Sequence, residues 1–202
     1  MPKEVLNQYL GLQREADRQR MQLILQSAPL LKGVKMSCIL IVEQIYFHML
    51  IEELKHTQIQ YKIFCEKSGR YTLLLYREEM LQTYLNQENV EQFLKQYGYR
   101  RGAQENALSL QKSLSLLAKR VDYFNHQAGG TFPHEIGVFL GYPMEDVIGF
   151  IENAGKNYLL NGYWKVYSDA DRARQQFQAF DRARIVAAKE MFAGKSIREI
   201  VG

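Results

Sequence analysis

The chain has 202 residues, of which 47% are hydrophobic and 24% charged, and these values are ordinary for a globular protein. Its formal net charge of +4 is mild, and acidic residues are interspersed throughout, unlike the basic stripe of a nucleic-acid-binding domain. No apolar run approaches the roughly 20 residues of a membrane span, and the N-terminus lacks the layout of a signal peptide. We therefore expect one cytoplasmic domain over residues 1–202, with no membrane contact.

The first part of the chain, residues 1–128, is predicted to be helical with one β-hairpin. Apolar residues at helical spacing predict helices over Lys3–Gln26, Gln44–Lys55, Arg77–Leu85, Val90–Tyr97 and Ala103–Phe124. Pro29 and Gly33 indicate a loop after the first helix. The short apolar run Met36–Val42 is typical of a buried strand, which gives this part a third strand beside its hairpin.

The hairpin in this part has the clearest pattern. Gln60–Cys65 and Tyr71–Tyr76 are rich in aromatic and β-branched residues, and side chains in the first run alternate with the two-residue period of a strand. Ser68-Gly69-Arg70 lies between them, and glycine can adopt the positive φ that such turns need. We therefore predict two antiparallel strands joined by this turn.

The second part, residues 129–202, begins at the sharpest break in the chain, Gly129-Gly130. Pro133 suits the first turn of a helix because its missing N–H has no partner there, so we predict a helix from Pro133 to about Leu140. Gly141-Tyr142-Pro143 ends that helix, and a second helix is predicted over Met144–Glu152.

A second hairpin follows these helices. Asn157–Leu160 and Tyr163–Tyr167 flank Asn161-Gly162, which is the strongest two-residue hairpin signal. A long helix comes next, and Ser168 is predicted to cap it with Asp171 three residues further on.

A last capping box is predicted at Ser196 and Glu199, where another helix begins. Taken together, the elements predict an α+β fold. It consists of a small, mostly antiparallel sheet, made of the two hairpins and one strand, with helices covering it and a long C-terminal helix.

His134-Glu135 is the first candidate for chemistry. At a helix start, Glu135 favours the positive end of the helix dipole, and His134 lies beside unpaired backbone N–H groups. That setting suits an anion, a metal ligand or an acid–base pair. The alternative is structural: Glu135 stabilises the helix end and His134 caps or packs. A metal site would need further ligands, and none accompanies this pair.

The second hairpin is the other candidate, because it holds the only tryptophan. On a strand, Trp164 and Val166 share one face, which we expect to be buried, while Tyr163, Lys165 and Tyr167 share the other. An exposed row of this kind can bind a planar anionic ligand or stack bases. The alternative is an ordinary half-buried strand.

Other known site patterns are missing from the chain. The helices around Gly141-Tyr142-Pro143 have the lengths of a helix-turn-helix, but the second one is acidic, so we predict no DNA binding. No phosphate-binding glycine loop and no metalloprotease motif occurs. Cys38 and Cys65 are isolated and are expected to be buried, reduced thiols rather than a disulfide or a metal site.

The second part also carries a specific string of short motifs. Its members are Phe132-Pro133-His134-Glu135-Ile136-Gly137, Phe139-Leu140-Gly141-Tyr142-Pro143, Asp146-Val147, Gly149-Phe150-Ile151 and Gly162-Tyr163-Trp164-Lys165-Val166-Tyr167. Ala28-Pro29, Gly33 and Lys35 add an early loop. The string resembles bacterial domain-of-unknown-function family 3793, marked by "PHE" and "LGY" motifs, over most of the chain.

The resemblance implies a cytoplasmic bacterial protein without an established activity. It also implies an iron, haem or flavodoxin-linked redox setting. Many members of the family have cysteines near the positions of Ser27, Tyr158, Asn161 and Ala183, and this chain has none there. A thiolate metal or redox site is therefore not expected in this protein.

Two hypotheses of function follow. The first is a small-ligand or cofactor site, which is the active site of an enzyme if His134 and Glu135 are catalytic, and haem and flavin are the first cofactors to test. Tyr142, Tyr163, Trp164 and Lys165 would bind the ligand, which is expected to be small and anionic or planar. The second is a non-enzymatic interaction module, which docks on a redox or iron-handling partner such as a flavodoxin-like protein through its tyrosine face and basic C-terminal helix.

Overall fold

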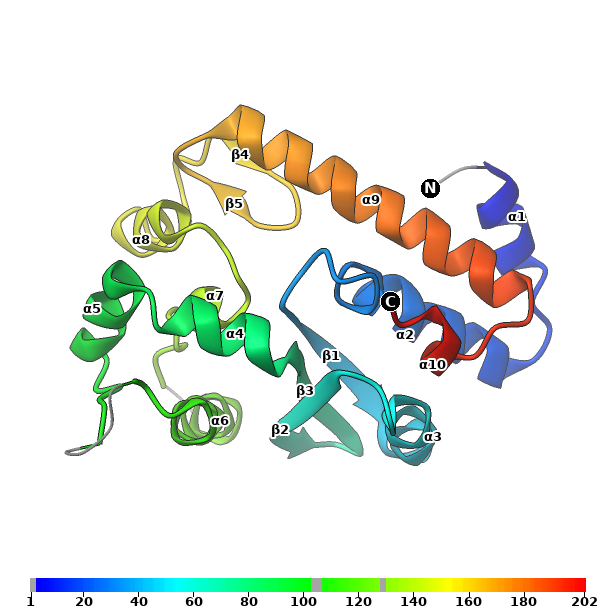
Figure 1. The fold of residues 1–202 in the computed structure, drawn as a ribbon, viewed down its shortest axis with the longest axis horizontal. Coiled ribbons are helices and arrows are strands. Elements are labelled where there is room, and N and C mark those ends of the chain that lie inside the picture. Colours follow the sequence, from blue (N-terminus) through cyan, green and yellow to red (C-terminus); the bar gives the residue numbers. More distant parts are fainter. Residues whose placement is uncertain (1–2, 103–106, 128–129) are drawn as a thin grey trace.

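The structure is a computed structural model and describes residues 3–102, 107–127 and 130–202. The helices are α1 (Lys3–Leu10), α2 (Glu15–Leu31), α3 (Gln44–Leu54), α4 (Glu78–Leu85), α5 (Glu88–Gln96), α6 (Leu110–His126), α7 (Ile136–Phe139), α8 (Met144–Glu152), α9 (Ala170–Phe192) and α10 (Ile197–Ile200). The strands are β1 (Ser37–Glu43), β2 (Ile59–Lys67), β3 (Arg70–Arg77), β4 (Leu160–Asn161) and β5 (Lys165–Val166). The α+β prediction is confirmed, and the long helix α9 crosses the molecule beside α2 (Figure 1).

The main sheet has the strand order β1-β3-β2, and both pairs are antiparallel. It confirms the first hairpin and the strand that precedes it. Ser68 and Gly69 form the turn with φ of 53° and 72°, the left-handed pair that a tight hairpin favours. A register shift between Ile63 and Cys65 marks a bulge, so Phe64 and Cys65 both enter the core.

Helices cover both faces of this sheet. Leu73 and Leu75 point to one face and pack with α2 and α3, while Leu74 points to the other and packs with α6. All three side chains have no exposed surface, because β3 is the central strand. The sheet therefore joins two large cores, and β1 at its edge extends toward the second part of the chain.

The N-terminal helix prediction was wrong in its boundaries. The chain forms two helices, α1 and α2, with a break at Gly11, which has the lowest helix preference of any residue but proline. Helix α2 runs through Pro29, where a loop was predicted. Pro29 lies in the last turn of α2, and its carbonyl accepts the N–H groups of Val34 and Lys35 at 2.8 and 2.9 Å.

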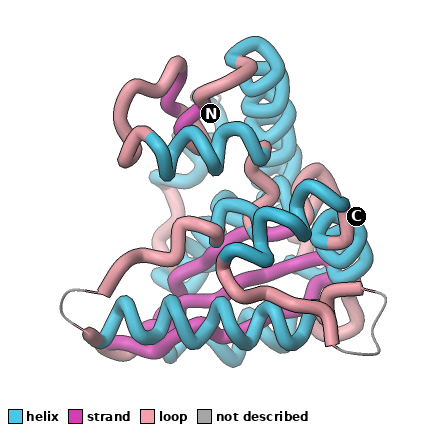
Figure 2. The backbone as a smooth tube through the Cα atoms, turned by 90° about the vertical axis from the view of Figure 1, so that its left-hand side faces the viewer, coloured by secondary structure: helices cyan, strands magenta, loops and turns pink. Residues whose placement is uncertain are grey.

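The second hairpin forms a sheet of its own instead of joining the first (Figure 2). Asn161 pairs with Lys165, so the connection is Gly162-Tyr163-Trp164, and the predicted Asn161-Gly162 turn was wrong. The reason is burial, because Trp164 turns inward against Phe180 of α9. The predicted burial of Trp164 and Val166 is confirmed.

Other helix limits also differ from the predictions. Helix α6 begins at Leu110 after an N-cap by Ser109, and residues 103–106 of its predicted start lie outside the described residues, as does Gly129 of the predicted break. Asp169, not Ser168, caps α9 by accepting the N–H of Arg172. The capping box of Ser196 and Glu199 is confirmed, as are the limits of α8.

Candidate functional site

A cavity of about 390 Å³ opens where α7, α8 and the β4–β5 hairpin meet β1. His134, Tyr142, Tyr163, Trp164 and Lys165 line it, so the structure brings together five of the six residues predicted for a site. The remaining walls are mainly apolar, as small-molecule sites usually are. We refer to this space as the His134 cavity.

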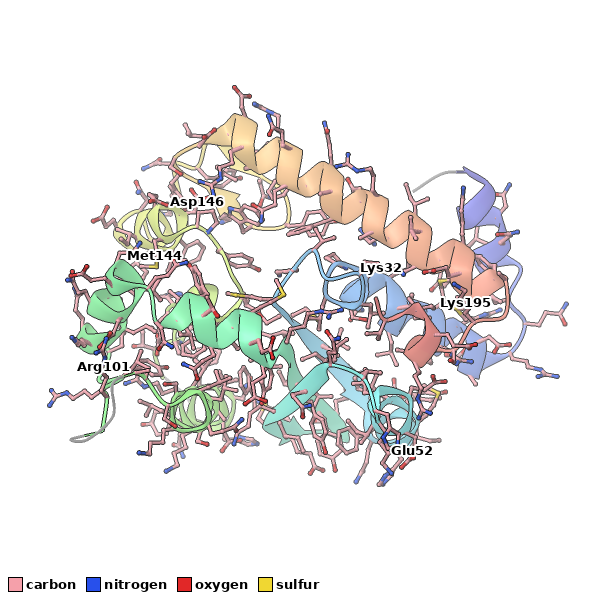
Figure 3. The ribbon with its side chains drawn as sticks, in the orientation of Figure 1. Lys32, Glu52, Arg101, Met144, Asp146 and Lys195 are labelled. Atoms are coloured by element: carbon pink, nitrogen blue, oxygen red, sulfur yellow. The ribbon has the colours of Figure 1, made fainter. Side chains whose placement is uncertain are left out.

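Asp146 holds the Trp164 wall of the cavity in place. It lies in the first turn of α8 (Figure 3), and the residue is 3% exposed. Trp164 Nε1 donates to its Oδ2 at 2.7 Å, while Oδ1 accepts the backbone N–H of Tyr167 at 2.8 Å and both the N–H and the hydroxyl of Ser168 at 3.1 and 3.0 Å. One buried carboxylate therefore ties α8 to the hairpin and to the start of α9, with bonds that its charge strengthens.

Tyr142 forms the neighbouring wall. The chain turns at Gly141, whose φ is +71°, and this turn directs the Tyr142 ring onto the indole of Trp164. The two ring centroids are 5.4 Å apart with an interplanar angle of 26°. Burial raises the pKa of Tyr142, so its phenol is neutral at physiological pH and contributes a flat, uncharged surface.

His134 is half-buried at the edge of the cavity. Its ring lies 5.5 Å from the ring of Phe132 and 5.2 Å from that of Phe150, measured between centroids. Among the described residues, neither ring nitrogen of His134 has a hydrogen-bond partner. The imidazole is therefore positioned by apolar contacts and keeps both nitrogens available for a ligand, as an acid–base group or as a donor to a metal.

Lys165 provides the positive charge of the cavity. Its Nζ donates to the carbonyl of Gly155 at 2.7 Å and lies 5.0 Å from the ring centroid of Tyr158. It forms no ion pair with a carboxylate in the described part of the chain. The predicted exposed row of Tyr163, Lys165 and Tyr167 is instead half-buried, because the β4–β5 hairpin packs between α8 and α9.

Glu135 does not line the His134 cavity. The predicted helix from Pro133 was too long at its start: His134 and Glu135 form a turn that precedes α7. This turn directs the Glu135 carboxylate to Arg120 Nη1 at 2.5 Å, and the hydroxyl of Tyr99 donates to it at 3.2 Å. Burial alone would lower the pKa of Arg120, but its hydrogen bond to Glu135 raises it. Glu135 is thus a buried acceptor in a structural pair with the partly exposed Arg120.

A family model described as "Protein of unknown function (DUF3793)" matches residues 23–201. The chain belongs to this family. The match spans every residue of the His134 cavity and confirms the resemblance that the motif string indicated. No curated protein and no solved structure matches the chain.

Ser27 and Asn161 stand near positions where many members of the DUF3793 family have cysteines. In this chain the Ser27 hydroxyl donates to Leu23 O within α2, and Asn161 lines the cavity. Cys38 and Cys65 are buried free thiols, as predicted. Within the described residues, no group of three or more His, Cys, Asp and Glu side chains is arranged to hold a metal ion. No helix in the same residues has the length and apolar character for crossing a membrane.

Sequence reasoning missed Asp146 as a part of this site. Asp146 was considered as an acidic residue of the second helix, which argued against DNA binding, and as part of the Asp146-Val147 motif, but it was given no role in the site. Its partners follow 18 to 22 residues later, so no local pattern connects them. The available signal was position: Asp146 lies in the first turn of a mostly apolar helix, whose exposed N–H end favours an acid, but the same is true of the exposed Glu145.

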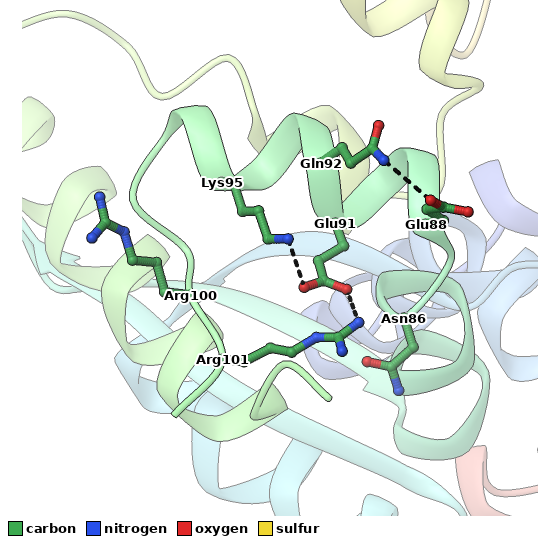
Figure 4. A pocket seen from close by; sticks show the side chains of 7 residues that line it. All are labelled: Asn86, Glu88, Glu91, Gln92, Lys95, Arg100 and Arg101. Carbon is green, nitrogen blue, oxygen red and sulfur yellow. Dashed lines mark hydrogen bonds and ion pairs between the residues drawn. The ribbon is translucent and has the colours of Figure 1, made fainter. Parts of the chain in front are cut away.

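A larger and more open hollow of about 820 Å³ lies beside α5 (Figure 4). Its charges largely neutralise one another, because the buried carboxylate of Glu91 pairs with Lys95 at 3.4 Å and also with Arg101. None of the residues predicted for a site lines it. The His134 cavity is therefore the better candidate, despite its smaller volume.

Proposed function

We propose that this protein binds a small planar ligand with an acidic group in the His134 cavity. The observation that carries the proposal is the convergence of an uncommitted imidazole, an ammonium group without a carboxylate partner and two stacked aromatic rings on one concave space. A volume of about 390 Å³ lies within the range of about 300–1,000 Å³ that is usual for small-molecule sites.

Each wall has a separate role in this proposal. The stacked pair of Tyr142 and Trp164 forms a rigid apolar wall for a ring system. Lys165 is the partner of the acidic group, and Tyr163 completes the hairpin side of the cavity, where its hydroxyl is fixed by a 2.8 Å bond to Asp181. His134 is the acid–base or metal-binding group. It acts without Glu135, since that carboxylate is bound to Arg120.

Haem and flavin are the cofactors to test first, in a cytoplasmic iron or flavodoxin-linked redox setting. The donor set fits either group: an imidazole nitrogen of His134 suits a haem iron or a flavin edge, and Lys165 suits a propionate or a phosphate. Either cofactor supplies electron-transfer chemistry when bound, while the residues of this chain orient it and exclude water.

The alternative, a module that docks on a flavodoxin-like partner through its tyrosine face, has less support. Docking of that kind favours flat, exposed aromatic residues, whereas Tyr163 and Tyr167 are half-buried. The basic residues of α9 include Arg174, which already pairs with Asp171. We therefore prefer the ligand-binding proposal.

The test begins with an absorption spectrum and intact-mass analysis of the purified protein, followed by titration with haemin, FMN and a nucleotide panel. His134→Ala and Lys165→Ala are expected to weaken binding by roughly tenfold or more each, as the loss of a charged or coordinating contact does. His48→Ala and Lys156→Ala are matched controls, because both side chains are exposed and line no part of the cavity. Absence of any binding, or equal affinity of all four variants, would refute the proposal.

A further inference from the structure

Lys35 lies in the loop between α2 and β1, outside the His134 cavity but behind one of its walls. Its backbone N–H donates to the carbonyl of Pro29 at 2.9 Å, which fixes the loop against the end of α2. Its Nζ is 5.1 Å from the ring centroid of Tyr142 and 5.9 Å from that of Phe180. The amine is therefore held against two aromatic rings from separate segments of the chain.

The polar surroundings of Lys35 differ from those of other lysines. Four lysines are half-buried in the part of the chain that the structure describes: Lys32, Lys35, Lys62 and Lys165. Lys32, Lys62 and Lys165 each donate a hydrogen bond to a protein oxygen, at 2.8, 3.0 and 2.7 Å. The Nζ of Lys35 has neither a hydrogen bond nor an ion pair with any described residue.

No anionic group compensates for the burial of this amine. Desolvation lowers the pKa of Lys35, an effect that the nearby Cys38 only partly opposes. Burial raises the pKa of the Cys38 thiol to about 12, and burial also raises the pKa of the Tyr142 phenol, so both groups are neutral at physiological pH. The aromatic faces attract the ammonium form, but they do not replace its lost hydration.

We propose that Lys35 is a nucleophilic lysine that condenses with the carbonyl group of a small aldehyde or 2-oxo acid. The lone pair of Nζ attacks the carbonyl carbon and forms a C–N bond, which gives a carbinolamine. One amine hydrogen moves to the former carbonyl oxygen as the carbinolamine forms. The C–O bond then breaks, the hydroxyl leaves as water with the second amine hydrogen, and a C=N bond remains. The step consumes no oxidant or reductant, and a desolvated lysine in apolar surroundings is the usual form of such a nucleophile.

This inference does not depend on what occupies the His134 cavity. The two sites share Tyr142, whose ring stacks on Trp164 in the cavity wall and also faces Lys35. A small carbonyl compound is the expected substrate class, because Lys35 is half-buried beside two aromatic rings. A bound imine would displace no hydrogen bond of the described residues.

The test uses the full chain with glyoxylate or propanal as the probe. Each probe is incubated with the protein at pH 7, the imine is reduced with borohydride, and adducts are assigned to individual lysines by peptide mass spectrometry. Desolvation lowers the pKa of Lys35 and so raises the fraction of its amine that is neutral at pH 7, and Lys35 should therefore carry at least about twofold more adduct than the exposed Lys156. Raising the pH to 10 should reduce this preference.

Lys35→Arg keeps a cation against the rings but is not a nucleophile at these pH values, so it is expected to fold and to lose the preferred adduct. Lys156→Arg is the control and should leave the Lys35 adduct unchanged. A Lys35 adduct no more abundant than that of Lys156, or one formed only in urea, would overturn the proposal. Either result would assign Lys35 as a packing cation, and neither result bears on ligand binding in the His134 cavity.

Discussion

Asp146→Asn is the substitution that most directly tests how the site is held together. The asparagine side chain has nearly the same shape, but only one of its two terminal atoms is an oxygen acceptor. If that oxygen keeps the bonds to Tyr167 and Ser168, the NH₂ group faces the donor Nε1 of Trp164, and no hydrogen bond forms there. A hydrogen bond to a charged acceptor contributes about 1.5–3 kcal/mol, and an unsatisfied buried donor costs about 1–3 kcal/mol. Since the residue is 3% exposed, we expect Asp146→Asn to lower the free energy of unfolding by about 3 kcal/mol.

Urea unfolding measures this loss. With a slope of about 2 kcal/mol per molar urea, the midpoint should fall by about 1.5 M. Trp164 is the only tryptophan, so its fluorescence reports on the substituted region itself. Glu145→Gln is the matched control, because Glu145 occupies the same helical turn but is exposed. Its effect should stay within about 0.5 kcal/mol.

A double-mutant cycle with Trp164→Phe, followed by circular dichroism, isolates the bond between the two side chains. In the Asp146→Asn background, Trp164→Phe removes the indole N–H and with it the contact between two donors. In the native background, the same substitution leaves Oδ2 of Asp146 without its hydrogen bond. The two substitutions should therefore be non-additive by about 1 kcal/mol or more. Additive effects, or an Asp146→Asn variant as stable as the native chain, would show that the carboxylate does not organise the site as argued.

Three further predictions concern neighbouring features. Glu135→Gln should lower the unfolding free energy by about 1–3 kcal/mol in urea melts, since Glu135 is buried and its partner is partly exposed, but should leave ligand affinity unchanged in titrations. Gly162→Ala places a Cβ 2.2 Å from the ring of Phe177 and should lower the free energy of unfolding by about 1–3 kcal/mol in the same melts. Gly11→Ala is the control: its Cβ has no contact under 3.4 Å, and the loss should be less than about 0.5 kcal/mol. Burial raises the pKa of Cys38 from an ordinary 9.0 to about 12 in the folded chain, so the thiol of the unfolded chain ionises first. The free energy of unfolding should therefore fall as the pH rises from 9.0 toward 12. Urea melts of the native chain and of Cys38→Ala at pH 8 and pH 10 measure the first part of this loss.

The sequence was a good guide wherever local period and turn chemistry decide the structure. Ser68-Gly69 adopts the predicted turn because its backbone angles depend mainly on those two residues. The burial of Val166 was predictable because strand side chains alternate, whereas Trp164 is buried from the connection between β4 and β5. The connection between β4 and β5 was not predictable, since the packing of Trp164 against Phe180 overrides the preference of Asn-Gly for a tight turn.

The candidate site was predicted in its composition but not in its organisation. Five of the six residues meet in one cavity, because the turn at Gly141 and the β4–β5 hairpin both border α8 and form neighbouring walls of that cavity. Glu135 was wrongly predicted to lie in the site beside His134, since adjacent residues in a turn point in different directions. The direction of the Glu135 side chain is fixed by its partner Arg120, which lies 15 positions earlier in the chain. Long-range partners of this kind leave no trace in a local sequence pattern.

The position of Asp146 also explains why a ligand in the His134 cavity should stabilise the whole second part of the chain. Asp146 is linked to Trp164, and Trp164 is linked through ring contacts to Tyr142 on one side and to Phe177 of α9 on the other, at 5.4 and 4.5 Å between centroids. A ligand that packs on Tyr142 and Trp164 therefore contacts the same assembly that anchors α8 to α9. Because binding to the folded state alone raises stability by RT ln(1 + [L]/Kd), a ligand at about 100 times its Kd should add about 2.7 kcal/mol to the native chain. A ligand that bound elsewhere could stabilise the chain equally, but it would not protect the Trp164 fluorescence from quenching by acrylamide.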